Sequence, residues 1–119
     1  MKIILDANFL MMPHQFGVDI FEYLKDYEIE TLSPVIEELK KLAKKRNDDG
    51  IAAKVALKLT KENKVKIIRT KETADKAILD LAVREKCAVG TNDKALIEAL
   101  KENHIKIIRL KQKKFLAEE

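Results

Sequence analysis

The chain has 119 residues, which suits one domain spanning residues 1–119 and leaves little room for a second. Apolar residues make up 46% of the chain and charged residues 37%, a mix that can build a core under a solvated surface and that argues against disorder. No apolar run approaches the roughly 20 residues of a membrane span, so no membrane association is expected.

The net charge of +4 is unevenly distributed along the chain. Residues 1–60 carry 9 Lys+Arg against 10 Asp+Glu, a net of −1, whereas residues 61–119 carry 15 against 10, a net of +5. A basic half suits a polyanionic partner, because lysines release counterions from phosphates. A surface rich in Lys and Glu also occurs in thermophilic proteins, so charge alone leaves both interpretations open.

Cysteine usage and the opening residues favour a cytoplasmic location. Cys87 is the only cysteine, which excludes an internal disulfide and fits a reducing compartment. The segment Met1–Asp6 turns acidic too early for a secretory signal.

Hydrophobic periodicity predicts strands that alternate with helices. Ser33 and Pro34 suit the N-cap and the first position of a helix. Asn47–Gly50 has the composition of a turn, and the polar tail Lys111–Glu119 is expected to fray. The predicted strands are Lys2–Leu5, Glu30–Leu32, Val65–Arg69, Cys87–Val89 and Ile105–Leu110, and the predicted helices are Val18–Tyr27, Ser33–Arg46, Ile51–Asn63, Glu72–Lys86 and Asn92–Glu102.

This alternation predicts an α/β fold with a parallel sheet and helices on both faces. Lys2–Leu5 and Cys87–Val89 are mostly or wholly apolar, as buried central strands are. Val65–Arg69 and Ile105–Leu110 carry lysine and arginine, as edge strands often do. We therefore expect the first and fourth strands to lie at the centre of the sheet.

Two aspartates follow these central strands. Asp6 ends the first strand, and Asp93 follows the fourth in the segment Gly90–Asp93. If the two strands are neighbours, both carboxylates meet at the edge of the sheet where such folds bind ligands. The alternative for Asp6 is a turn or capping aspartate. The alternative for Asp93 is an acid favoured by the dipole of the next helix, with Thr91 or Asn92 as the cap of that helix.

Helix geometry separates Glu38 from its neighbour Glu37. Glu38 shares a stripe with Val35 and Leu42, whereas Glu37 lies with Lys41 on the wet face. A carboxylate on an apolar stripe is costly unless a charged or hydrogen-bonding group meets it. Glu38 is therefore the stronger candidate for a functional role.

Asp75 lies one turn before Leu79, on the expected core side of its helix, whereas Asp80 points elsewhere. A first-turn acid favoured by the helix dipole is the alternative interpretation of Asp75.

Four converging acids would repel one another unless a cation lies among them. Carboxylate oxygens without Cys or His select hard ions such as Mg²⁺ or Mn²⁺. His14 and His104 share no helix with each other or with an acid, so zinc is disfavoured. An acid cluster of this kind suits phosphodiester cleavage.

Short motifs along nearly the whole chain resemble those of PIN-domain nucleases. They are Ile4–Leu10, Pro34–Leu39, Ala74–Leu79 and Gly90–Leu96, and their order is more specific than any one of them. The segment Pro13–Ile20 is similar to that of archaeal members related to the eukaryotic small-subunit rRNA-processing nuclease. VapC-type toxin ribonucleases belong to the same broad family.

The resemblance implies a three-layer α/β/α fold whose five-stranded parallel sheet has the order 3-2-1-4-5. It implies a metal-dependent endoribonuclease that uses Mg²⁺ or Mn²⁺ and cleaves single-stranded RNA. By motif position, the catalytic and metal-binding acids are Asp6, Glu38, Asp75 and Asp93, with Asn8 and Thr91 as supporting hydrogen-bonding residues.

The biological role stays open between rRNA processing and a VapC-like toxin. The partners that remain open are correspondingly a pre-ribosome, an antitoxin or a second copy of the chain. A PIN-fold RNA-binding or scaffold module with little activity is the alternative function. An aspartyl phosphatase is disfavoured because the chain reads Asp6-Ala7-Asn8 rather than Asp-x-Asp, and a receiver domain because no aspartate ends the third strand.

Overall fold

Strand β1 (Lys2–Leu5) forms the centre of the sheet because Ile3, Ile4 and Leu5 are all fully buried. In the computed structural model, which describes residues 1–119, six strands follow the order β3-β2-β1-β4-β5-β6. The first five are parallel and have the predicted order, with β1 and β4 inside. The other strands are β2 (Glu28–Leu32), β3 (Lys66–Ile68), β4 (Ala88–Gly90), β5 (Ile107–Lys111) and β6 (Phe115–Glu118).

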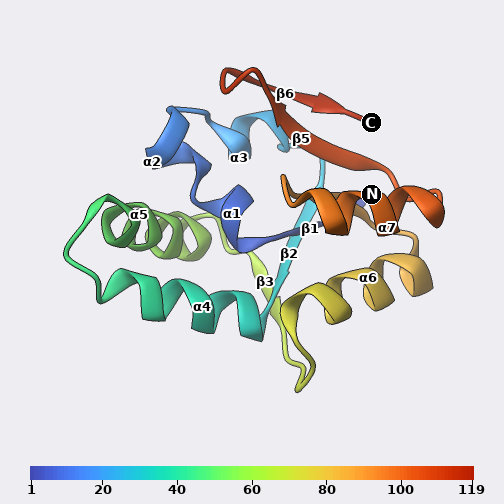
Figure 1. The fold of residues 1–119 in the computed structure, drawn as a ribbon, viewed down its shortest axis with the longest axis horizontal. Coiled ribbons are helices and arrows are strands. Elements are labelled where there is room, and N and C mark those ends of the chain that lie inside the picture. Colours follow the sequence, from blue (N-terminus) through green and yellow to red (C-terminus); the bar gives the residue numbers. More distant parts are fainter.

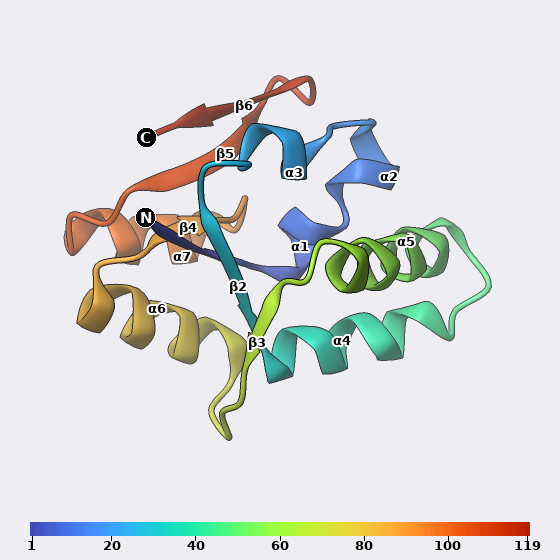
Figure 2. The same cartoon turned by 180° about the vertical axis from the view of Figure 1, so that it is seen from behind.

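Helices cover both sides of this sheet (Figures 1 and 2). Helices α6 and α7 lie on one side, and α1, α2, α4 and α5 on the other (Figure 1). Their bounds are α1 (Ala7–Leu10), α2 (Met12–Phe16), α3 (Ile20–Tyr23), α4 (Ser33–Ala43), α5 (Asp48–Glu62), α6 (Ala74–Glu85) and α7 (Lys94–Glu102). No helix is both long and apolar enough to cross a membrane.

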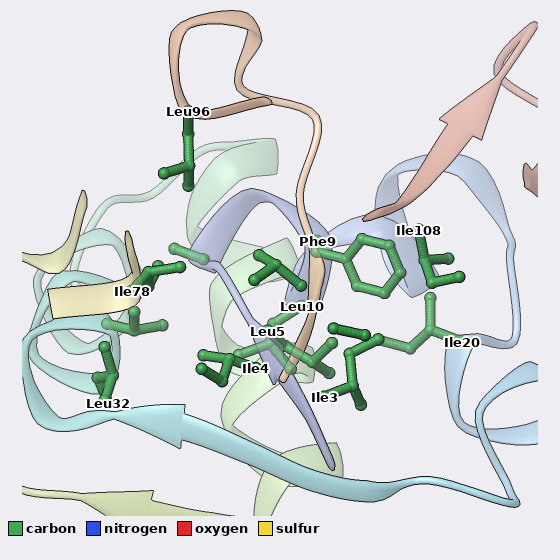
Figure 3. Packing of buried hydrophobic residues seen from close by; sticks show 14 of the residues in the cluster. Ile3, Ile4, Leu5, Phe9, Leu10, Ile20, Leu32, Ile78, Leu96 and Ile108 are labelled. Carbon is green, nitrogen blue, oxygen red and sulfur yellow. The ribbon is translucent and has the colours of Figure 1, made fainter. Parts of the chain in front are cut away.

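Each face of the sheet carries its own apolar side chains, because successive side chains along a strand point to opposite faces. Figure 3 shows Leu32 and Ile78 on one side of β1, and Phe9, Ile20 and Ile108 on the other. All five side chains are at most 1% exposed. The sheet is therefore packed on both faces. This packing leaves the ends of its strands open for a ligand-binding site.

The prediction that Lys111–Glu119 frays is wrong. Strand β6 pairs antiparallel with β5, and Leu116 packs in the core opposite Leu110. The carboxylate of Glu119 lies 2.8 Å from Lys101 Nζ and 3.0 Å from Lys111 Nζ. Strand β5, which was predicted to be an edge strand, therefore lies inside the sheet between β4 and β6. The hairpin was missed because its turn uses Gln112 and Lys113 at positive φ rather than glycine or asparagine.

Helix boundaries also differ from the prediction at several points. Helix α3 spans four residues within the predicted range 18–27. Helices α1 and α2 span four and five residues and were not predicted, since such short segments carry no periodic pattern. Leu32, not Ser33, is the N-cap of α4, because the Ser33 hydroxyl bonds the backbone of Thr70 instead.

The predicted turn Asn47–Gly50 is the start of α5. The Asn47 side chain caps that helix by accepting a hydrogen bond of 3.0 Å from the amide of Gly50. Gly50 suits this position because its α-carbon packs directly against the carbonyl oxygen of Lys45, where a Cβ would collide with backbone. Glycine here marks close approach of α5 to the connector that follows α4.

This contact predicts that Gly50→Ala destabilises the fold. The carbonyl of Lys45 belongs to the backbone of the connector between α4 and α5, so that connector or the start of α5 must shift. We expect a loss of about 1–3 kcal/mol, the usual cost of overpacking, measured by urea denaturation.

Lys58→Ala on the exposed face of α5 is the control and should change the free energy of unfolding by less than about 0.5 kcal/mol. Equal midpoints for Gly50→Ala and the wild type would contradict the close-approach interpretation.

Candidate active site

A pocket of about 580 Å³ opens at the carboxyl ends of β1 and β4. The two strands pair in register, with Leu5 opposite Gly90, so the segments that follow them leave the sheet side by side. The pocket brings together all four predicted acids, which come from separate parts of the chain. Its lining is Asp6, Ala7, Asn8, Met11, Glu38, Thr73, Ala74, Asp75 and Asp93.

Asp6 is the buried acid of this pocket, with 5% of its surface exposed. Its backbone amide continues the sheet by donating to the Gly90 carbonyl at 3.0 Å. One carboxylate oxygen, Oδ1, accepts from the Ala7 amide at 2.8 Å and so caps helix α1. The other, Oδ2, accepts from Asn8 Nδ2 at 3.1 Å and from Thr91 Oγ1 at 3.0 Å. Asp6 is therefore both a cap and a pocket residue.

The two supporting residues predicted from the sequence also hold the segment after β4. Thr91 Oγ1 accepts from the amide of Asp93 at 3.1 Å, while Asn8 Oδ1 accepts from the amide of Asn92 at 3.1 Å. Each residue thus bonds Asp6 with one hydrogen bond and the Asp93 segment with another. This pairing places Asp6 and Asp93 together without direct contact between their carboxylates.

Asn92 anchors the same segment from its far side, a role the sequence did not indicate. Its Oδ1 accepts from the Leu110 amide at 2.7 Å, and its Nδ2 donates to the Leu110 carbonyl at 3.4 Å. The side chain therefore continues the pairing of β4 with β5 beyond the last paired residue. The order of the two strands was predicted, but nothing in the sequence pointed to this side-chain contact.

Asp93, rather than Thr91 or Asn92, is the N-cap of α7. Its Oδ1 accepts from the Leu96 amide at 3.1 Å, three residues along the helix. The prediction that Thr91 or Asn92 caps this helix is wrong, because Asp93 itself caps α7 and also lines the pocket. The second oxygen, Oδ2, makes no hydrogen bond to the protein.

Glu38 and Asp75 differ from Asp6 in their exposure. Both line the pocket, but both are exposed to solvent rather than facing a closed core, as the helix stripes had suggested. The stripe of α4 points at the pocket instead, so water relieves the expected cost of burial. Asp75 also lies in the first turn of α6, where the helix dipole favours an acid. Glu37 lies outside the pocket.

Burial and mutual repulsion act together on two of the acids. Burial raises the pKa of the Asp6 carboxyl above its usual value, and Asp75 and Asp93 raise it further, against the Ala7 and Thr91 hydrogen bonds that lower it. Partial burial raises the pKa of Glu38, and the charges of Asp6 and Asp75 add to this rise. The acids are thus close enough to share one negative field.

The donor set of the pocket fits a hard divalent cation. The acids supply carboxylate oxygens, with an amide oxygen from Asn8 near them and no imidazole or thiol in the lining. No three acidic, histidine or cysteine side chains are arranged to hold a metal ion as they stand. The exposed side chains of Glu38 and Asp75 would have to turn toward Asp6 to complete such a site.

Comparison with known proteins shows to which family and proteins this chain is similar. A family model described as a PIN like domain matches residues 3–113. Ribonuclease VapC4 of Methanocaldococcus jannaschii is 38% identical over 124 residues, covering 96% of this chain and 93% of that protein. A domain of a functionally unknown protein from the same organism has the same fold, with a TM-score of 0.67 and 18% identity over 92% of this chain and 91% of that one.

The hydrogen bond from Thr91 to Asp6 predicts a pH-dependent cost for Thr91→Val. The hydroxyl stabilises the ionised carboxylate, so its loss raises the pKa of Asp6 further. Asp6 then opposes folding more strongly once the pH exceeds that pKa, and the cost shrinks at low pH, where Asp6 is protonated. We expect about 1–3 kcal/mol at pH 7 in EDTA and less at pH 4, measured by chemical denaturation.

Thr31→Val is the matched control. Thr31 is also fully buried, but its hydroxyl donates to the Leu5 carbonyl at 2.7 Å, a group that does not titrate. Its cost should be the same at both pH values. A cost of Thr91→Val that does not change with pH would show that Asp6 is not charged in the folded protein.

Proposed function

The chain belongs to the PIN-like domain family, and we propose that it is a metal-dependent endoribonuclease that cleaves phosphodiester bonds in single-stranded RNA. The observation that carries the proposal is the pocket in which carboxylates from four separate segments gather at the open end of a parallel sheet. The name of its relative, ribonuclease VapC4, supports the same activity.

The proposed ligands of Mg²⁺ or Mn²⁺ are Asp6, Glu38, Asp75 and Asp93. When bound among them, such an ion supplies a more acidic water as nucleophile and positive charge beside the phosphate oxygens. A cation there also offsets the repulsion that raises the pKa values of Asp6 and Glu38. The acids are thus suited to the ion by both their chemistry and their electrostatics.

Some residues of the site hold a carboxylate in place, and others are free to turn toward the ion. Asn8 and Thr91 hold Asp6 in one orientation by donating to Oδ2, and they are positioning residues in this proposal. Asp93 keeps Oδ2 free while Oδ1 caps α7. Glu38 and Asp75 are exposed and can turn toward the ion and the substrate.

The relative favours a toxin-type ribonuclease over a role in rRNA processing. A toxin of this class implies an antitoxin as partner, and we include that partner in the proposal. If the chain instead binds RNA without cleaving it in either metal, the alternative of an RNA-binding or scaffold module replaces the nuclease.

Glu38 and Glu37 form a matched pair for testing the active site. They are adjacent in α4, but only Glu38 lines the acidic pocket. Glu38→Gln should lower kcat for cleavage of a labelled single-stranded RNA in Mn²⁺ by roughly 100-fold or more, as expected for a lost metal ligand. Glu37→Gln should retain most of kcat. Similar losses from the two changes would contradict the assignment of Glu38.

Asp93 separates metal binding from helix capping. Asparagine caps helices as well as aspartate does, so Asp93→Asn should leave the melting temperature in EDTA nearly unchanged while shrinking the rise caused by Mn²⁺. Asp93→Ala should lower both, because it also loses the cap at a cost of about 1 kcal/mol. Thermal-shift titrations with Mn²⁺ measure both quantities.

The same titration has a definite pH dependence. Mn²⁺ must displace protons from Asp6 and Glu38, whose raised pKa values keep those protons to higher pH. The Mn²⁺-induced rise should therefore be smaller at pH 5 than at pH 7.5. A full rise in Asp93→Asn, or a rise independent of pH, would place the metal elsewhere.

A further inference from the structure

A second pocket, of about 430 Å³, lies beside the acidic one and has the opposite character. We call it the β3 pocket; its lining is Ser33, Ile36, Glu37, Lys40, Ile67, Arg69 and Thr70. It is formed by the first turns of α4, by β3 and by the residues that follow β3. None of the four acids of the active site lines it.

Lining residues of the two pockets lie close together in sequence on two stretches of chain. In α4, Glu38 lines the acidic pocket, and the preceding residue, Glu37, lines the β3 pocket. In the segment that enters α6, Thr70 lines the β3 pocket and Thr73 the acidic one. An extended nucleotide chain that passes the acids can therefore continue into the β3 pocket.

The segment between the pockets is held in place by Ser33. Its hydroxyl donates to the Thr70 carbonyl at 3.2 Å and accepts from the Thr70 amide at 3.0 Å. Thr70 Oγ1 in turn accepts from the Glu72 amide at 3.2 Å. These bonds join the start of α4 to the end of β3, so the pocket is built by the fold rather than by a free loop.

Lys40 and Arg69 are the cations of the β3 pocket, and neither forms an ion pair within 4.0 Å. They are therefore free to bind an anion. Glu37 is the one carboxylate in the lining. It opposes a phosphate beside it, but it can accept a hydrogen bond from the exocyclic amine of a base.

An apolar wall completes the pocket. Ile67, on the edge strand β3, is 46% exposed although it is a large apolar residue, and Ile36 is 9% exposed. Cations beside an exposed apolar wall match the two parts of a nucleotide, a phosphate and a base with an apolar face. Neither a metal ion nor a purely apolar ligand would use both features.

We propose that the β3 pocket binds the nucleotide that flanks the scissile phosphate in single-stranded RNA, with Arg69 and Lys40 on its phosphate and Ile67 against its base. The proposal rests on the proposed nuclease function and extends it to the path of the substrate. It turns α4 into a divider, with cleavage on the side of Glu38 and substrate binding on the side of Lys40.

Binding of a labelled single-stranded RNA in EDTA tests the pocket independently of cleavage. Lys40→Gln combined with Arg69→Gln should weaken binding roughly tenfold, the scale of losing two charge-assisted phosphate contacts. The slope of log affinity against log salt should fall by about 0.7, since the two cations hold one phosphate and each neutralised phosphate of a single strand contributes about 0.7. Fluorescence anisotropy measures both quantities.

The matched control is Lys41→Gln combined with Lys66→Gln. These residues neighbour Lys40 in α4 and Arg69 in the β3 segment, are exposed, and do not line the pocket. The control removes the same net charge and should weaken binding much less. Equal losses in the two double variants, or no loss in either, would overturn the proposal.

Cleavage in Mn²⁺ supplies a second readout. The Lys40→Gln, Arg69→Gln variant should raise KM and keep kcat, and its defect should disappear when the RNA is trimmed on one side of the cleaved bond. A fall in kcat with unchanged KM would overturn the pocket as a binding site. If the wild type cleaves no RNA, the nuclease proposal fails, while the anisotropy comparison still decides whether this pocket binds RNA.

Discussion

The carboxylate of Asp6 is a negative charge at the bottom of a buried site, and such a charge is tolerated only where hydrogen-bond donors surround it. Its donors come from two places in the chain: Ala7 and Asn8 after β1, and Thr91 after β4. These groups can meet only if β1 and β4 are neighbours and in register, as they are. The order of the central strands and the polar network at their ends therefore depend on each other.

The same network makes one side of the site rigid and leaves the other adjustable. Asp6 and the segment with Asp93 are joined through Asn8 and Thr91, and Asn92 ties that segment to β5. Glu38 projects from the middle of α4 and Asp75 from the first turn of α6, and both are exposed to solvent. Such a division suits a site whose acids repel one another, because two fixed carboxylates cost less to hold together than four. A stability cost at a site of this kind is common where acids are gathered for chemistry.

The sequence shows an excess of positive charge over the whole second half of the chain. In the structure, positive and negative charge are separated over a shorter distance, on either side of α4. The acidic pocket lies on one side of its first turns, and the β3 pocket with Lys40 and Arg69 on the other. A polyanion that approaches the acids directly is repelled, whereas one held by neighbouring cations brings its phosphate to the acids at lower cost. The positively charged β3 pocket thus lies next to an acidic pocket that is suited to bind a cation.

The sequence by itself determined the alternation of strands and helices, the central place of β1 and β4, and the positions of Asp6 and Asp93 at the ends of these strands. These features follow from local periodicity and from the apolar composition of the central strands. Only the tertiary structure decided that Glu38 and Asp75 are exposed in the shared pocket, that Asn92 bonds β5, that Gly50 packs against Lys45, and that β6 joins the sheet. Each of these depends on which segments distant in sequence come into contact. Local sequence periodicity does not specify which distant residue a side chain will contact.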